Sequence, residues 1–259
     1  MEYGSGAAAR TSIAAPGGPP LPRTSRRSER AKPSRTRNQL LDSLGRAERA
    51  AVLADCEPMQ LRFAAVLCEP GDRIRYAYFP QAGAIALIAH ADRRAALEVG
   101  SVGNEGMFGF PLALGRQRQP LRAIVEAPGE ALRIDAARLR EHLARLPGLQ
   151  REVQRQLADL LSELARAAAC NRFHVVEARL ARWLLQSQDH AQSAEFDLTH
   201  EFVASMLGVR RVGVTQAAGA LQRRRLIRYR RGHVTILNRS GLEAASCSCY
   251  SAASQSAPA

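Results

Sequence analysis

The feature that most constrains the fold is a helix, a tight turn, a second helix and a hairpin, all expected within residues 199–237. Thr199 offers the side-chain oxygen of an N-cap, and the amphipathic helix that follows it ends at Gly208. Glycine adopts without strain the left-handed conformation that a sharp turn between helices requires. The second helix has one apolar face, formed by Val214, Ala217, Ala218 and Leu221. Because two alternating runs at 226–229 and 233–237 follow, the pattern predicts a helix-turn-helix with a two-stranded wing.

The opposite face of the second helix carries side chains that are able to read DNA. Arg donates to guanine O6 and N7, Gln pairs with adenine N6 and N7, and a Val or Thr methyl group contacts the thymine methyl. Gly219 removes bulk where the helix would approach the duplex, although Gly213 and Gly219 each disfavour an unbroken helix by about 1 kcal/mol. We therefore expect base contacts from Arg211, Val212, Thr215 and Gln216.

Positive charge is concentrated in two segments of the chain. Lys and Arg number 37 against 24 Asp and Glu, and the net charge is +13. Nine basic residues and one acidic residue lie in 199–239, and eight basic and two acidic residues lie in 1–37. A run of arginines is often only a solvated helix end, but beside a reading helix it neutralises phosphates and makes DNA affinity steeply dependent on salt. Backbone contacts are expected from Thr199, Arg210, Arg223, Arg230 and Arg231, with Arg224, Arg225 and Arg228 in the same basic run.

In the first half of the chain, short alternating runs are separated by turns. Ile74, Tyr76 and Tyr78 fall on one side of a run whose other side carries arginines, as in a half-buried strand. Pro70-Gly71 and Pro128-Gly129 each have the residue order of a type II turn. Many short strands joined by close turns predict a small antiparallel barrel or jelly roll. The other apolar runs lie at 85–88, 97–102, 123–125 and 131–134.

A long amphipathic helix is expected over 147–171, beginning at Pro147, a residue that suits the first helical position. Its apolar residues recur at spacings of four and three, the pattern by which two helices pack along each other. We expect a dimer interface formed by Val153, Leu157, Leu160, Leu164 and Ala167. The alternative is a helix that lies on its own barrel, and Leu161 would then be buried as well. A second amphipathic helix with Trp183 on its apolar face leads into a polar linker at 186–193.

In the order and spacing of these motifs, residues 38–245 resemble the Crp/Fnr family of bacterial transcription regulators. The resemblance rests on the segments THEFVASMLG at 199–208, VRRVGVTQ at 209–216 and Leu226-Ile227, which follow a long helix and a glycine-rich barrel containing Pro70-Gly71-Asp72. It implies an α+β fold with an N-terminal antiparallel β-roll, a jelly roll like that of cyclic-nucleotide-binding domains. It also implies a long dimerisation helix and a winged helix-turn-helix whose groove-reading helix spans 210–223. The expected organisation is a disordered basic tail at 1–37, a sensor domain at 38–146, the dimerisation helix at 147–171, the DNA-binding domain at 172–245 and a flexible tail at 246–259.

The resemblance also shows where an effector pocket would lie and how this sequence departs from the family pattern. Members that bind cyclic nucleotides hold the ribose with a Glu and the cyclic phosphate with an Arg. At the corresponding positions this sequence has Phe110 and Leu121. A phenyl ring accepts no hydrogen bond from a hydroxyl in place of a carboxylate, and an Arg one position later points to the other face of a strand. We therefore expect no cyclic AMP or cyclic GMP binding by the pocket positions Gly109, Phe110, Leu121 and Arg122.

The five cysteines do not form a recognisable disulfide framework, and their odd number fits a reducing compartment. Cys56, Cys68 and Cys170 are far apart in the sequence, which argues against an iron–sulfur cluster. Cys247 and Cys249 supply only half of a tetrahedral zinc shell, so inert thiols are favoured, with Cys170 as a small core residue. The sequence predicts no metal and no cofactor, and it does not identify an effector.

The sequence thus predicts a DNA-binding transcription regulator that binds a two-fold symmetric operator as a homodimer. The expected partners are double-stranded DNA and, for an activator, RNA polymerase. No apolar stretch is long enough to span a membrane, so the cytoplasm is the expected location. The sequence has no nucleophile–base pair or carboxylate pair at a diagnostic spacing, so an enzyme is not expected. The alternatives are a small-molecule-binding interaction module without a role on DNA and, less favoured, a DNA-processing enzyme.

Overall fold

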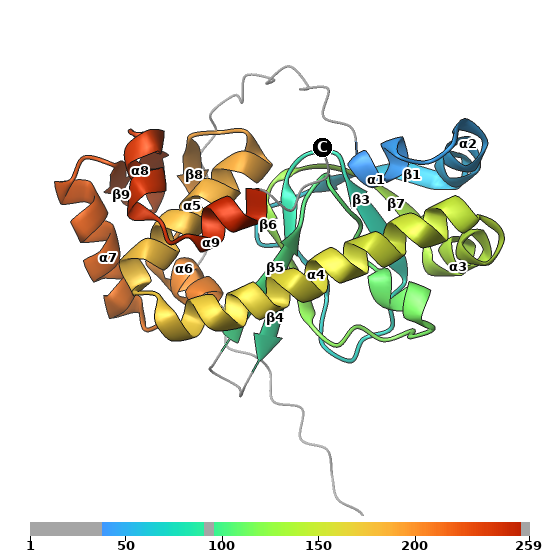
Figure 1. Ribbon diagram of the computed structural model, residues 1–259, viewed down its shortest axis with the longest axis horizontal. Helices are drawn as coiled ribbons and strands as arrows, with labels where there is room; N and C mark the ends of the chain where they lie inside the picture. Colours follow the sequence, from blue (N-terminus) through green and yellow to red (C-terminus); the bar gives the residue numbers. More distant parts are fainter. Residues whose placement is uncertain (1–37, 91–95, 255–259) are drawn as a thin grey trace, which may run out of the picture. The chain divides into compact units, whose positions relative to one another are not determined.

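The strands of the N-terminal half form two antiparallel sheets around the barrel core (Figure 1). The computed structural model describes residues 38–90 and 96–254. The strands of the barrel are β1 (Cys56–Leu61), β2 (Val66–Cys68), β3 (Tyr76–Pro80), β4 (Ala84–His90), β5 (Ala96–Val102), β6 (Arg122–Ala127) and β7 (Gly129–Asp135). One sheet has the order β1-β7-β3 and the other the order β2-β6-β4-β5. The predicted antiparallel β-roll is confirmed. The basic tail expected at 1–37 lies outside the described residues.

Short helices flank the barrel strands, and the sequence patterns did not predict them. They are α1 (Gln39–Asp42), α2 (Arg46–Ala54), the 3₁₀ helix η1 (Phe110–Leu114) and α3 (Ala136–Arg145). The buried side chain of Asn38 caps α1 by accepting a 3.1 Å hydrogen bond from the Leu41 amide, and it also donates to the Pro80 carbonyl at 3.0 Å. Apolar side chains of these helices therefore belong to one of the core clusters of the barrel.

Strand β3 differs from the predicted half-buried strand because it lies between two apolar clusters. Tyr78 belongs to one cluster, whereas Ala77 and Phe79 belong to the other, and all three side chains are buried. Ile74 precedes the strand and packs with Phe79, not with Tyr78. Two-residue alternation of polar and apolar residues therefore ends at Tyr76, the first residue of the strand.

One of the two predicted turns is present and the other is not. Gly71 has φ +85°, the left-handed conformation that the expected turn after Pro70 requires. Gly129, by contrast, begins β7 and pairs with Leu61 of β1. A Cβ atom at Gly129 would lie 2.2 Å from the Ala82 carbonyl oxygen, so this glycine permits a close approach of two backbones. A Pro-Gly pair alone does not distinguish these two uses of glycine.

Helix α4 (Pro147–Phe173) packs against β5 of the barrel. Val153 has no exposed surface and Leu160 is 8% exposed, each in a core cluster that includes barrel residues. Leu157 and Leu164 are half-buried against the same clusters, and Ala167 is buried. The five residues assigned to a dimer interface thus lie mainly within their own chain, and that assignment is corrected. Leu161, which the intramolecular alternative would have buried, is 68% exposed.

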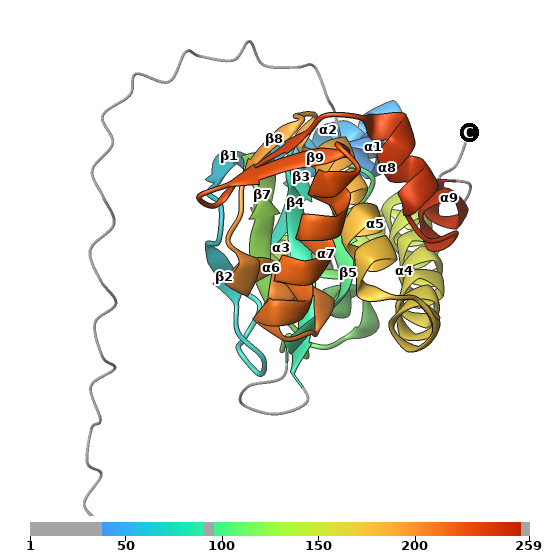
Figure 2. The same ribbon diagram turned by 90° about the vertical axis from the view of Figure 1, so that its left-hand side faces the viewer.

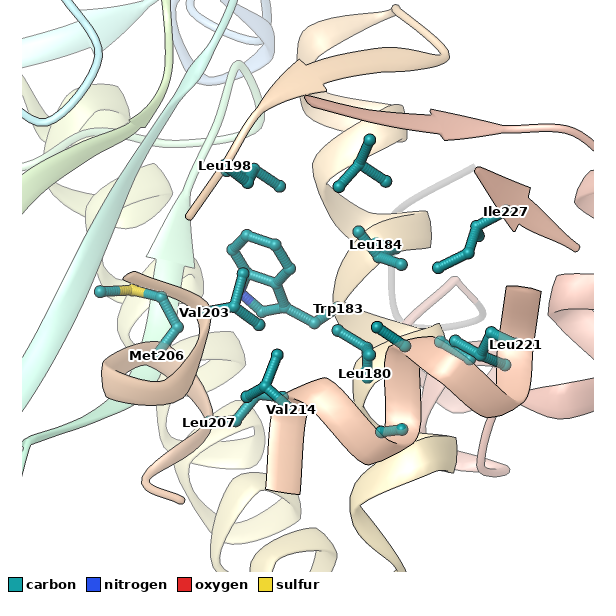
Figure 3. Packing of buried hydrophobic residues seen from close by; sticks show 14 of the residues in the cluster. Leu180, Trp183, Leu184, Leu198, Val203, Met206, Leu207, Val214, Leu221 and Ile227 are labelled. Carbon is teal, nitrogen blue, oxygen red and sulfur yellow. The ribbon is translucent and has the colours of Figure 1, made fainter. Parts of the chain in front are cut away.

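The C-terminal half begins with α5 (Val176–Ala191), and Trp183 on this helix lies among the apolar side chains of α5, α6 and α7 (Figure 3). The further elements are β8 (Glu195–Asp197), α6 (His200–Leu207), α7 (Arg211–Arg223), β9 (Ile227–Arg230), β10 (His233–Ile236), α8 (Arg239–Ala245) and α9 (Cys249–Ser254). The wing is a sheet of order β8-β10-β9, and it therefore has one strand more than the predicted two-stranded hairpin. The sequence analysis missed β8 because three residues are too few to show alternation.

Two segments expected to be irregular are ordered. Residues 186–191 of the predicted linker continue α5, because the buried Ser187 hydroxyl donates to Glu126 of the barrel at 3.1 Å. Residues 249–254 of the predicted flexible tail form α9, and Cys247 before it is buried. Tyr250 of α9 donates to Asp189 at 2.7 Å and accepts from Arg239 at 2.6 Å. Among the described helices, none combines the length and the apolar character that a membrane span needs.

Candidate DNA-binding surface

The turn between α6 and α7 has the cap and the glycine that the sequence predicts. The Thr199 hydroxyl oxygen accepts a 3.1 Å hydrogen bond from the Phe202 amide at the start of α6. Gly208 ends α6 with φ +62°, and the Val209 amide donates to the Ala204 carbonyl at 3.0 Å. Arg210 is the N-cap residue of α7, with its side chain exposed. The two helices are therefore held at a short, fixed turn.

Helix α7 has one buried and one exposed face, and Figure 2 shows it on the surface that faces the viewer. Its buried residues are the four that the sequence predicts: Val214, Ala217, Ala218 and Leu221. Gly213 and Gly219 do not interrupt the helix. The exposed side chains near the N-terminal end are Arg211, Val212, Thr215 and Gln216. Val212 is 57% exposed, which leaves its methyl groups available to a partner.

His200 of α6 links α7 to the wing on this surface. Its Nδ1 atom lies 2.9 Å from the Thr215 hydroxyl, and its ring lies 4.3 Å from the ring of Tyr229 on the wing. Burial, together with the nearby charge of Arg211, lowers the pKa of His200. The Thr215 hydroxyl also donates to the Arg211 carbonyl at 3.1 Å. Thr215 therefore has its hydroxyl engaged within the fold and only its methyl group free for thymine.

The wing presents its basic tip on a two-residue turn. Arg231 has φ +51° and Gly232 has φ +81°, while His233 pairs with Arg230 across the hairpin. Positive φ at both central residues is the geometry of a type I′ turn, whose twist matches that of the two strands. Arg230 and Arg231 are exposed at this tip. The turn thus places two arginines at the end of the wing.

The arginines before the wing differ in whether they form an ion pair within the protein. Arg224 forms a 2.9 Å ion pair with Glu177 of α5, and its expected role in neutralising phosphate stays a prediction. Arg223, Arg225 and Arg228 are exposed. The ion pair could not be foreseen because Glu177 lies 47 residues earlier in the chain.

A family model described as the Crp-like helix-turn-helix domain matches residues 178–245. Residues 178–245 therefore form a Crp-like helix-turn-helix domain, which includes α6, α7 and the β9–β10 hairpin of the wing. The sequence-based prediction of a DNA-binding regulator is thereby confirmed. No curated protein is similar enough in sequence to count as a match.

Solved structures of Crp/Fnr proteins share the fold of most of the chain. A Crp/Fnr-family transcriptional regulator from Eubacterium rectale is 16% identical, with a TM-score of 0.63 over 79% of this chain and 96% of its own. A Crp/Fnr-family transcriptional regulator from Thermus thermophilus is 23% identical, with a TM-score of 0.60 over 73% of this chain and 98% of its own. The c-di-GMP-responsive regulator CLP from Xanthomonas campestris is 20% identical, with a TM-score of 0.59 over 73% and 98%. At these identities the likeness establishes the fold.

Three of the four expected effector residues have side chains that take part in apolar packing or in an ion pair. Phe110 is 7% exposed and belongs to a barrel core cluster, against which Leu121 packs. Gly109 has φ +107° where the chain enters η1. Arg122 pairs with Glu69 at 3.2 Å. These side chains therefore have partners within the protein itself.

Two cavities of the barrel lie at other residues. One, of about 410 Å³, is lined by Arg73, Arg75 and Arg140 among others. The second, of about 290 Å³, is lined by residues that include Asp72 and Tyr78. None of the four expected effector residues lines either cavity.

Proposed function

We propose that the protein regulates transcription by binding a two-fold symmetric DNA operator as a homodimer, with α7 in the major groove. The observation that carries this proposal is the exposed face of α7. Arg211, Val212 and Gln216 stand free on it at the end that would enter the groove, with the methyl group of Thr215 beside them. Arg and Gln supply bidentate hydrogen bonds to guanine and adenine, and the methyl groups supply thymine contacts.

Contacts to the DNA backbone are proposed from residues that surround the reading helix. Arg230 and Arg231 at the wing tip and Arg223 at the end of α7 are exposed cations, as is Arg210 before α7. Thr199 is exposed at the start of α6. These groups fix the position of the protein on the duplex without reading its sequence.

The proposed dimer interface is an exposed stripe of α4, one position along from the buried residues. Small and apolar side chains recur there at spacings of four and three: Ala158, Leu161, Ala165 and Ala168. Two copies of α4 that meet along this stripe would supply the two identical reading helices that a symmetric operator needs. The stripe remains exposed, whereas Val153, Leu157, Leu160 and Leu164 pack in core clusters that include barrel residues.

The barrel is proposed as a sensor that does not take cyclic AMP or cyclic GMP. Phe110 occupies the expected ribose position with an apolar ring, and Leu121 offers no charge to a phosphate. Binding of either nucleotide at micromolar concentration in isothermal titration calorimetry would contradict this part.

We further propose a cytoplasmic location and, if the protein is an activator, a contact with RNA polymerase.

The experiment that tests the proposal compares two classes of variant on a selected operator and on scrambled DNA. Arg211→Ala and Gln216→Ala should each weaken operator binding by about 1–3 kcal/mol and affect scrambled DNA much less, because they remove base contacts. Arg230→Ala and Arg231→Ala should weaken both DNAs alike and reduce the salt slope by roughly one per lost phosphate contact. Fluorescence anisotropy over a range of salt concentrations gives both quantities.

Arg151→Ala is the matched control, since this exposed arginine lies near the N-terminal end of α4. It should leave both affinities unchanged. The assignment of α7 as the reading helix is wrong if Arg211→Ala and Gln216→Ala lower the affinities for operator and scrambled DNA by the same factor.

A further inference from the structure

Two cysteines near the C-terminus meet a cysteine and a histidine from the end of α4. Cys170 and Cys247 are separated by 77 residues, yet their Sγ atoms lie 3.6 Å apart. The Sγ atom of Cys249 lies 3.7 Å from Nδ1 of His174. One ligand-type atom from each of the four residues lies within 4.8 Å of the others. The separate, inert thiols expected from the sequence are in fact one cluster.

Local structure explains why the four side chains converge. Cys170 lies in the last turn of α4, and His174 is the C-cap residue directly after this helix, so both are held at the same helix end. Cys247 and Cys249 follow α8 in a segment where only the exposed Ser248 separates them. This segment lies against the end of α4 because α9 contacts both α4 and α5.

The distances fit ligands of one small ion and exclude a bond between the sulfurs. Zinc binds Cys sulfur at about 2.3 Å and His nitrogen at about 2.0–2.1 Å, so the ligands of a tetrahedral site lie roughly 3.5–3.8 Å apart. The two distances of 3.6 and 3.7 Å fall in this range. A disulfide would need sulfurs about 2.05 Å apart. Three sulfurs and one imidazole nitrogen form the Cys₃His donor set of structural zinc sites.

Burial and charge also suit a metal held inside the protein. Cys170 has no exposed surface and Cys247 is 6% exposed, whereas His174 and Cys249 are half-buried. Three thiolates around a divalent cation leave one negative charge. Arg182 on α5 places a positive charge near all three cysteines, which opposes this negative charge.

We propose that Cys170, His174, Cys247 and Cys249 bind one Zn²⁺ ion in a closed tetrahedral site. All four ligands come from the protein, so the ion has a structural rather than a catalytic role. The site joins the end of α4 to the segment that follows α8. Because α4 ends at Phe173 and α5 begins at Val176, the ion spans the junction between the proposed dimerisation helix and the DNA-binding unit. Binding of the ion would stabilise the orientation of the DNA-binding unit relative to α4.

The first test measures the metal content of the full chain, purified under reducing conditions without chelators and dialysed against Zn²⁺ and then buffer. Inductively coupled plasma mass spectrometry should find about one zinc per chain. His174→Ala and Cys249→Ser change half-buried ligands, and each should lower the zinc content severalfold. Cys56→Ser, at a half-buried cysteine outside the cluster, is the matched control and should keep the wild-type content. Wild-type protein with far less than one zinc per chain would overturn the proposal, as would variants that keep it.

A second test needs no substitution and holds even if a ligand variant fails to fold. Wild-type protein is stripped with a chelator under reducing conditions and titrated with Co²⁺ alone. The expected result is the intense visible absorption of tetrahedral Co²⁺ together with sulfur-to-cobalt charge transfer, both abolished by one equivalent of Zn²⁺. A weak octahedral spectrum would overturn the proposal. Removal of zinc should also lower the melting temperature of the wild type, and an unchanged melting temperature would overturn the structural role.

Discussion

Thr215 shows how a single side chain on α7 divides its atoms between folding and recognition. Its hydroxyl lies 2.9 Å from His200 and 3.1 Å from the Arg211 carbonyl oxygen, while its exposed position leaves the methyl group facing outward. His200 in turn stacks on Tyr229, which connects α6, α7 and the wing through one imidazole ring. The residue types alone suggest a base-reading threonine, because a sequence does not show that the hydroxyl already has a partner.

Replacing Thr215 by Val tests this division of roles. Valine keeps a methyl group for thymine but removes the hydroxyl, so the free energy of unfolding should fall by about 0.5–1.5 kcal/mol. The preference for operator over scrambled DNA should change little. Urea unfolding and fluorescence anisotropy give the two quantities, and Gln216→Ala provides the contrasting case, with stability retained and preference lost. A large loss of preference in Thr215→Val would show that the hydroxyl itself reads a base.

At the scale of elements, α4 has the predicted helical spacing of apolar residues, but the face that we assigned to the dimer interface packs against the barrel. The buried residues Val153 and Leu160 and the exposed residues Ala158 and Leu161 follow the same spacing of four and three. A periodic pattern shows that a helix has an apolar side, but it does not identify the surface that covers that side. Here the barrel covers the first stripe, and the second stripe is left for another copy of the chain.

Leu161→Glu is therefore expected to weaken the homodimer without unfolding the chain. Its side chain is 68% exposed in the single chain, so a carboxylate there remains in water when the chain is monomeric. In a dimer joined along this stripe, two carboxylates would be brought together and desolvated. The dimer dissociation constant should rise at least about tenfold, equivalent to 1.4 kcal/mol. Sedimentation velocity over a range of protein concentrations measures this change.

Leu114→Glu serves as the control, because Leu114 lies in η1 and is 62% exposed. The dimer of Leu114→Glu should have the same dissociation constant as the wild-type dimer. An unchanged dimer in Leu161→Glu would move the interface away from this stripe of α4.

The elements that sequence reasoning predicted well are those whose signals are local. The cap at Thr199, the turn at Gly208 and the buried face of α7 depend on neighbouring residues, and the structure has them as predicted. The ion pair of Arg224, the cluster around Cys170 and the bracing by His200 join residues far apart in the chain. Such pairings depend on the tertiary fold, so a periodic pattern or a motif could not reveal them.

At the scale of the whole molecule, buried carboxyl groups connect the barrel to α5. Trp183 Nε1 donates to Glu98 of β5 at 2.7 Å, and the Ser187 hydroxyl donates to Glu126 of β6 at 3.1 Å. Glu126 is 4% exposed, and within residues 38–90 and 96–254 its Oε2 atom has no hydrogen-bond partner. Burial raises the pKa of Glu98 to about 8, with a further contribution from the charge of Glu126. Burial likewise raises the pKa of Glu126 to about 7, and that of Glu163 on α4 to about 7.

The stability of the folded chain should therefore respond to pH at this interface. In the unfolded chain these carboxyl groups lose their protons near pH 4.5, whereas the folded protein keeps them until about pH 7–8. Between these limits the folded state binds more protons, so the free energy of unfolding falls as pH rises. The stabilising contribution is complete below the unfolded pKa and is lost once pH passes the folded pKa. Ionisation of Glu98 and Glu126 destabilises the folded state, because it places negative charge in a buried contact between the barrel and α5.

Glu126→Gln isolates this effect, because the amide oxygen still accepts from Ser187 but the side chain no longer ionises. We expect wild type and variant to have similar free energies of unfolding at about pH 4, and the variant to be the more stable of the two at about pH 8.5. Urea unfolding at both pH values measures the difference, with Glu130→Gln as the control at an exposed position of β7. If the stabilities of wild type and Glu126→Gln changed in parallel between the two pH values, Glu126 would not be the titrating group. Should the difference appear as expected, the same protonation would also bias how the barrel holds the DNA-binding unit, since α5 carries Trp183 into the core that α6 and α7 share.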